Sequence, residues 1–188
     1  MIQEFVTLID KLIQLLKARK DAEERPLDVL VTPMYLDLQV IHNDYLHMFE
    51  KCRRDIESGV ALGDIANALL SDRLEMEAVR HSVSAFVDSY SENPRLKRYH
   101  EFFRSVWMYF YRYDMMRNVP GTLSQILLGE LDKWVREGQK QAFAPGLEIS
   151  ELDARKILAE VVSSHLCEIR RRWEELSKQY ANLMAAKV

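Results

Sequence analysis

Apolar residues recur at steps of three and four along almost the whole chain, with few residues that would interrupt a helix. The pattern is clear near the N-terminus, at Phe5, Leu8, Leu12, Leu15 and Leu16. This spacing places the apolar side chains on one face of an α-helix. Only 6 glycines and 5 prolines occur in 188 residues, which favours long helices over many short strands. We therefore expect helices that each bury one apolar face.

The expected helices cover about residues 2–20, 33–58, 64–90, 94–117, 122–138 and 150–184. Thr32 and Pro33 form a start signal for the second helix, which alternatively begins after Pro26 and contains Pro33 as a kink. Short connections between long helices favour antiparallel neighbours. The sequence predicts an all-α fold, an elongated up-and-down bundle of about five to six helices. Residues 1–22 are expected to form an amphipathic helix and residues 23–188 a single domain.

Composition excludes some classes of protein. Charged residues make up 29% of the chain and the net charge is −3, so nothing indicates a general attraction to nucleic acid. The N-terminal helix is interrupted by Asp10, Lys11 and Lys17 before it could span a membrane. Cys52 and Cys167 lack a CxxC spacing and are interpreted as buried free thiols. We expect a cytoplasmic, bacterial protein without a transmembrane segment.

The most aromatic stretch, residues 98–116, separates its rings from its charges when it is wound into a helix. Arg104, Ser105 and Arg112 fall on the side opposite the rings. A surface that stacks nucleic-acid bases needs exposed rings beside cations, and this pattern instead predicts a core face. That face comprises Phe102, Phe103, Val106, Tyr109, Phe110, Tyr113 and Met116, extended by Trp107.

Four polar residues lie within or beside the apolar stripes of the expected helices: His42, Asp72, Asp114 and His165. A buried carboxylate needs a partner, so one interpretation is an internal polar network. The alternative is a functional cavity that binds a metal or a small ligand, or performs acid–base chemistry. The paired Glu-x-x-His motif of di-iron bundles is absent from the sequence, and we expect no metal and no cofactor.

One short motif points to a different function. Arg95 and His100 are separated by four residues at the start of an amphipathic segment. This resembles the Arg-x4-6-His signature of HEPN-domain ribonucleases, small helical proteins of bacterial toxin and defence systems. The resemblance covers six residues, and Leu96 stands where that family usually has a polar residue. It implies metal-independent RNA cleavage with Arg95 and His100 as catalytic residues.

The last helix carries a run of arginines among glutamates. Glu168–Arg172, Arg170–Glu174 and Arg171–Glu175 have the spacing of surface ion pairs. We interpret the run as a solvated face and not as a nucleic-acid site.

The sequence contains no recognised arrangement for nucleophilic catalysis or phosphate binding. The leading hypothesis is therefore a non-enzymatic interaction or accessory protein that binds a protein partner or forms a homo-oligomer. Its candidate interface residues are Phe5, Leu8, Leu12, Leu15 and Leu16 of the N-terminal helix. The HEPN-like ribonuclease is the alternative, and it alone implies RNA as a partner.

Overall fold

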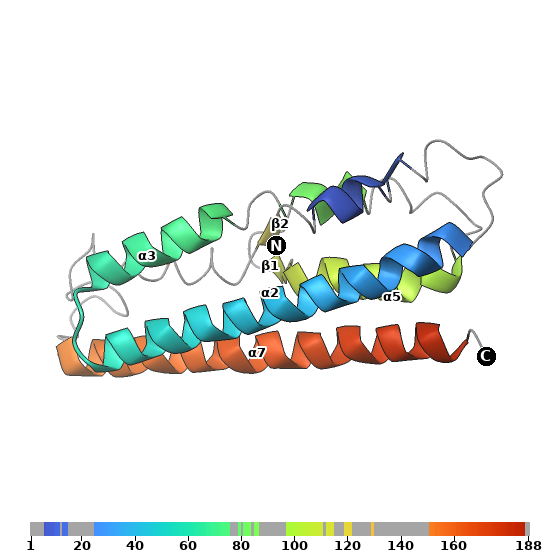
Figure 1. Cartoon of the computed structure of the whole chain (residues 1–188). Coiled ribbons are helices and arrows are strands. Elements are labelled where there is room, and N and C mark those ends of the chain that lie inside the picture. Colours follow the sequence, from blue (N-terminus) through green and yellow to red (C-terminus); the bar gives the residue numbers. More distant parts are fainter. Residues whose placement is uncertain are drawn as a thin grey trace. The chain divides into compact units, whose positions relative to one another are not determined.

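The computed structural model describes residues 6–11, 13–14, 25–75, 79, 81–83, 85–86, 97–110, 112–114, 119–121, 129 and 151–186. The prediction of an all-α bundle is confirmed (Figure 1). Its labelled elements are α2 (Arg25–Glu57), α3 (Leu62–Glu75), α5 (Lys97–Phe110), β1 (Arg112–Asp114), β2 (Val119–Gly121) and α7 (Glu151–Ala185). No helix in these residues is long and apolar enough to cross a membrane.

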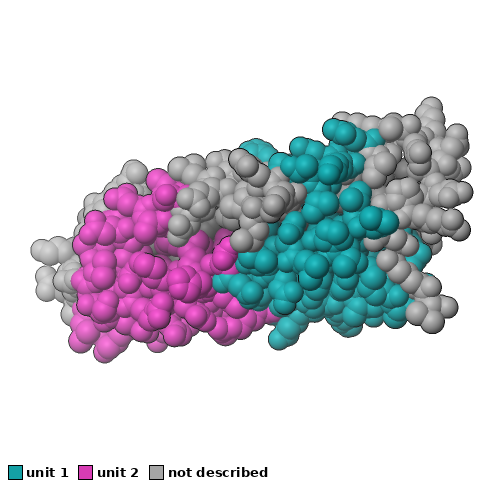
Figure 2. Space-filling view, viewed as in Figure 1, with its two compact units in different colours: residues 1–43, 76–110, 171–188 teal, residues 44–75, 111–170 magenta. Residues whose placement is uncertain are grey.

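The chain divides into two compact units, coloured separately in Figure 2. Unit 1 contains residues 1–43, 76–110 and 171–188, and unit 2 contains residues 44–75 and 111–170. The long helices α2 and α7 each contribute one segment to each unit. The predicted division at residue 22 stays a prediction, because residues 15–24 lie outside the described part of the chain.

Helix α2 begins before Thr32, as in the second of the two expected alternatives. It starts at Arg25 and contains Pro33. Proline has no N–H and costs about 3 kcal/mol inside a helix. Val31 and Met34 on either side are fully buried, whereas Pro33 itself is exposed. Tertiary packing of the flanking residues thus keeps the helix continuous through Thr32 and Pro33, which by themselves favour the start of a helix.

The C-terminus of α2 is closed by a Schellman motif centred on Gly59, which has a φ of 84°. The amide of Val60 donates to the carbonyl of Asp55 at 3.0 Å, and the amide of Gly59 donates to the carbonyl of Ile56 at 3.3 Å. This left-handed conformation suits glycine. In unit 2, Nη1 of Arg155 also donates to the carbonyls of Ile56 and Val60, at 3.3 and 2.9 Å. The helix end is therefore satisfied by both backbone and guanidinium donors.

In unit 1, α2 and α7 run antiparallel. The hydroxyl of Tyr180 donates to Oγ1 of Thr32 at 3.2 Å, and the hydroxyl of Tyr35 donates to Oγ of Ser177 at 3.0 Å. As the residue number rises along α2, its contact on α7 falls, so the two directions are opposite. The core of this unit takes residues from α2, α5, α7 and the segment 79–86: Val31, Met34, Leu38, Val79, Val83, Phe86, Tyr99, Phe102, Phe103, Val106, Leu176 and Leu183.

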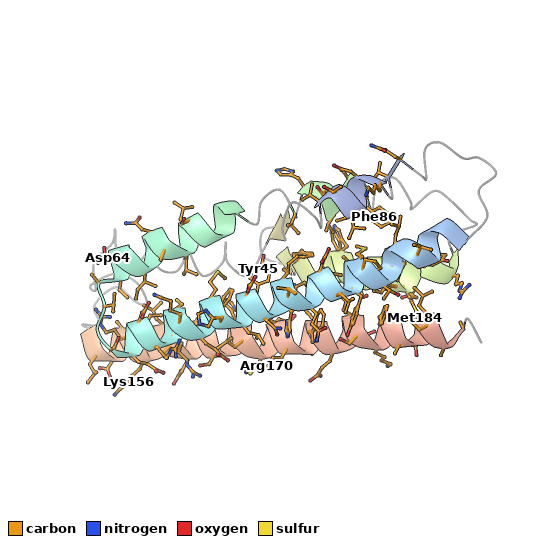
Figure 3. All side chains as sticks on the ribbon, viewed as in Figure 1. Tyr45, Asp64, Phe86, Lys156, Arg170 and Met184 are labelled. Carbon is orange, nitrogen blue, oxygen red and sulfur yellow. The ribbon has the colours of Figure 1, made fainter. Side chains whose placement is uncertain are left out.

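The predicted aromatic core face of α5 is confirmed over its described length. Phe102 and Phe103 are 1% exposed, and Phe103 packs edge-on against Phe86, which is labelled in Figure 3, with ring centroids 4.5 Å apart. The expectation that Ser105 faces solvent is wrong, because it is buried and its hydroxyl donates to the carbonyl of Phe102 at 2.6 Å. A serine can lie in a core face because its hydroxyl finds a backbone acceptor within its own helix.

In unit 2, α3 and the segments 44–57 of α2 and 151–170 of α7 supply the described core. Arg170 of α7, labelled in Figure 3, pairs with Glu50 of α2 at 2.8 Å. The apolar core residues lie at helical spacing on each element: Phe49, Cys52, Ile56, Ile65, Leu69, Ala154, Leu158, Ala159, Val162, Leu166 and Ile169.

The fourth expected helix is shorter than predicted. Helix α5 ends at Phe110, and Arg112–Asp114 form the strand β1. It pairs antiparallel with β2, Tyr113 opposite Pro120. Consequently Tyr113 and Asp114 do not belong to the aromatic helix face, and Met116 lies outside the described residues. Pro120 and Gly121 both lie in β2 itself.

The end of α5 is held by a buried arginine of α7. Nη1 of Arg172 donates to the carbonyls of Met108 and Tyr109, at 3.0 and 3.3 Å, and Arg172 is 8% exposed. The last carbonyls of a helix have no partner within it and carry partial negative charge. The expectation that Arg172 belongs to a solvated face is therefore wrong.

Candidate functional site

Four rings from α2 and α7 form a continuous stack in unit 1. His42 stacks on Trp173 with centroids 4.6 Å apart, Trp173 on Tyr35 at 5.4 Å, and Tyr35 on Tyr180 at 3.9 Å. Seven residues separate the two rings on each helix, which is close to two helical turns and puts them on one face. Because the helices are antiparallel, rings from the two helices alternate along the stack.

His42 is also tied to α5. Its Nδ1 and the hydroxyl of Tyr109 are hydrogen-bonded at 2.9 Å, and both residues are 5% exposed. The carbonyl of Tyr109 accepts from Arg172, so α2, α5 and α7 meet at this tyrosine. His42 thus has one polar partner on a neighbouring helix, and its part in a wider internal polar network stays a prediction. A neutral imidazole uses one ring nitrogen as acceptor and one as donor, so the ring can orient its neighbours.

The other three polar candidates all belong to unit 2. His165 is 5% exposed and lies in unit 2, where its ring is edge-on to Phe49 at 6.1 Å. Asp72 lies in α3 and Asp114 in β1, and the side chains of both are outside the description. A polar network that includes His165, Asp72 and Asp114 stays a prediction.

Within the described residues, no group of three or more His, Cys, Asp or Glu side chains is placed to hold a metal ion. Cys52 is buried, but Cys167 is exposed, so the expectation of two buried thiols is wrong for Cys167. The pKa of the Cys52 thiol is raised to about 12, mainly by burial and also by the carboxylate of Asp55, whereas Lys51 lowers it. Cys52 is thus an inert thiol at neutral pH, because the thiolate is the reactive form.

The ribonuclease motif is only half described. His100 lies in the first turns of α5 with 48% of its side chain exposed, and its Nδ1 is 3.4 Å from Oε1 of Glu101. Arg95 lies outside the described residues. The structure therefore shows an accessible imidazole and leaves the Arg95–His100 pair a prediction.

The N-terminal interface candidates are described only in part. Residues 6–11 and 13–14 are helical, and Leu8 is half-buried. Ile9, from the same apolar stripe, is 0% exposed within unit 1. The helix therefore uses part of its apolar face within its own unit. Phe5, Leu12, Leu15 and Leu16 lie outside the described residues, and their role in an interface stays a prediction.

A different surface has the chemistry of an interface. From residue 29 to 43, every exposed residue of α2 is uncharged, and Val29 and Leu36 are 72% and 54% exposed. We call these exposed residues, together with the half-buried Val40 among them, the neutral face. They are Val29, Pro33, Leu36, Gln39, Val40 and Asn43.

The same helix changes character at Asp44. Its exposed residues from there to the end of α2 are Asp44, His47, Lys51, Arg54 and Glu57. The contrast isolates side-chain chemistry, because secondary structure and exposure are alike in the two segments. A solvated helix face carries charged and polar residues, as the second segment does, and the neutral face departs from that rule at Val29, Pro33 and Leu36.

Sequence reasoning missed the neutral face, although a signal was present. Asp37 is the only Asp, Glu, Lys or Arg between residues 29 and 43. A helix that is apolar on all sides is normally buried, so this stretch could have been assigned to the core. Only the structure shows that one side of it is open to solvent.

No protein-family model matches the chain, and it matches neither a curated protein nor a solved structure.

Proposed function

We propose that this protein is a non-enzymatic helical-bundle protein whose function is protein–protein interaction through the neutral face of α2. The observation that supports this proposal is the uncharged exposed surface between Val29 and Asn43 on a helix whose next exposed residues are charged or titratable. Scattered apolar residues on a surface are normal, whereas an aligned apolar group is typical of an interaction site.

The apolar members of the neutral face form one row. Val29, Pro33, Leu36 and Val40 follow one another at intervals of four, three and four residues, the spacing by which one helix packs along another. Complete burial of a valine or leucine side chain stabilises an association by about 1.5–3 kcal/mol. A helix or helical hairpin laid along this row would remove Val29 and Leu36, the two most exposed members, from water.

The proposal is tested by placing a photo-crosslinking amino acid at Leu36 and illuminating cells of the source organism that express the variant. The control carries the same amino acid at Lys178, an exposed position of α7 in the same unit. We expect a protein adduct from position 36 that is absent from position 178 and is lost when Val29→Glu is added. No protein adduct from position 36, or equal adducts from both positions, would refute the proposed function.

Ribonuclease activity is the second candidate, favoured by the exposure of His100 on α5. The purified protein would be incubated with single-stranded and structured RNA beside Arg95→Ala, His100→Ala and the control Arg104→Ala. Under the interaction proposal, no cleavage depends on Arg95 or His100. Cleavage lost in both of those variants and retained in the Arg104 variant would instead establish the ribonuclease.

A further inference from the structure

Pro33 lies inside α2, and residues 25–32 precede it in the same continuous helix. A proline has no N–H to donate to the carbonyl of Val29, four residues earlier, and its ring crowds that carbonyl. The same residue type is favourable at the first position of a helix, where no such hydrogen bond is needed. Proline therefore favours a helix that begins at residue 33 over one that begins at Arg25.

Thr32 suits either of these two arrangements. In the continuous helix its Oγ1 accepts a hydrogen bond from the hydroxyl of Tyr180 at 3.2 Å. In a helix that begins at Pro33, Thr32 is the N-cap residue, and Oγ1 accepts from the backbone N–H of Tyr35. The same oxygen thus serves α7 in the first arrangement and its own helix in the second.

The ring of Tyr180 is held by residues outside 25–32. It stacks on Tyr35 with centroids 3.9 Å apart and an interplanar angle of 1°, and its centroid lies 6.0 Å from that of Phe102. Both of these residues follow Pro33 in the chain. The Tyr180 hydroxyl therefore keeps its place whether or not residues 25–32 are helical, and it can hold or release Thr32 without moving.

Packing opposes the preference of the proline. Val31 is 0% exposed and Leu30 is half-buried, so both resist opening, whereas Val29 is 72% exposed and adds little. The free energy gained by burying one valine is similar in size to the cost of a proline inside a helix. We propose that residues 25–32 form a strap that opens and closes at Pro33, and that the Tyr180–Thr32 hydrogen bond is the latch that keeps it closed.

Opening of the strap changes the neutral face. Val29 belongs to the strap, whereas Leu36 and Val40 belong to the part of α2 that stays helical. The apolar row is therefore complete only when the strap is closed. This consequence rests on the proposed function, whereas the strap and its latch do not.

Amide hydrogen exchange of the full chain, measured residue by residue by NMR, tests the latch. In the closed helix the amides of residues 29–32 donate to carbonyls four residues earlier, and they exchange when the strap opens. Tyr180→Phe keeps the stacked ring and removes the latch. We therefore expect exchange at 29–32 to become faster by about tenfold.

Tyr35→Phe is the matched control. It removes the hydroxyl that donates to Ser177, a hydrogen bond that lies beyond the strap and stays formed when the strap opens. Exchange at 29–32 should therefore change by less than about twofold in this variant.

Two further variants test the parts of the strap that lie in α2 itself. Pro33→Ala restores an N–H that can donate to the carbonyl of Val29, so exchange at 29–32 should slow by at least about tenfold. Thr32→Val removes the oxygen that accepts from Tyr180. In that background Tyr180→Phe should have no further effect on the exchange rates, because the latch is already absent.

Faster exchange at 29–32 in Tyr180→Phe but not in Tyr35→Phe, together with slower exchange in Pro33→Ala, supports the strap. Exchange that Tyr180→Phe leaves unchanged, that both tyrosine variants raise equally, or that Pro33→Ala fails to slow overturns it. The exchange measurement uses the isolated protein and needs no partner. Its result therefore stands whether or not the photo-crosslinking experiment supports the proposed function.

Discussion

Replacing Arg172 by methionine tests the idea that α7 closes α5. The change keeps a long side chain and removes the guanidinium that donates to the carbonyls of Met108 and Tyr109 at 3.0 and 3.3 Å. A hydrogen bond to a charged group contributes about 1.5–3 kcal/mol, and the longer of these two bonds belongs at the low end. Relief from burying the charge offsets part of the loss. We expect the free energy of unfolding to fall by about 2–4 kcal/mol.

The assay is urea denaturation followed by far-ultraviolet circular dichroism, with Arg171→Met as the matched control. Arg171 is the neighbouring residue of the same helix and is exposed, so its replacement should cost less than about 1 kcal/mol. Native-state hydrogen exchange should also be faster in α5 of the Arg172 variant. If the two variants unfold within about 0.5 kcal/mol of each other, the proposed closure of α5 by Arg172 is wrong.

Three further changes test individual contacts. Tyr109→Phe removes the buried hydroxyl that is hydrogen-bonded to Nδ1 of His42. The free energy of unfolding, measured by urea denaturation, should fall by about 1–3 kcal/mol. A fall of less than about 0.5 kcal/mol contradicts a structural role for this bond. Gly59→Ala should lower the free energy of unfolding by about 1 kcal/mol through backbone strain. Strain is the only cost expected, because φ is 84° and nothing lies within 4 Å of the added carbon. An unchanged free energy of unfolding would argue against the left-handed turn. Because burial raises the pKa of Cys52 from 9.0 to about 12, the native state holds the thiol proton more tightly than the unfolded state. The stability that this provides is complete below about pH 9 and is lost as pH rises toward 12, so wild-type stability should fall more steeply in this range than that of Cys52→Ala, and parallel pH curves would disprove the shift.

Local periodicity was sufficient to predict which faces of the helices are buried. In α5, Phe102, Phe103 and Val106 were all expected on the core face, and each is 1% exposed. This works because helix geometry converts sequence spacing into a face without reference to any other element. The same reasoning identified His42 as a polar residue beside such a stripe, but it could not identify Tyr109 as its partner.

Errors arose where a distant residue decided the outcome. Arg172 has the spacing of a surface ion-pair residue, yet it is buried because its guanidinium donates to carbonyls at the end of α5. Pro33 has the signature of a helix start, yet the packing of Val31 and Met34 continues the helix through it. In both cases a contact with another element outweighed a preference that arises within the helix itself.

The sequence by itself determined that this chain is helical and which faces of its helices are apolar, because these properties follow from spacing within a single helix. Only the tertiary structure decided which apolar side chains find a place inside. The stretch from 29 to 43 is apolar on more than one side, and a bundle can cover one side of a helix while leaving another open. Val29 and Leu36 remain in solvent for that reason, and the interaction proposed for this protein depends on that difference.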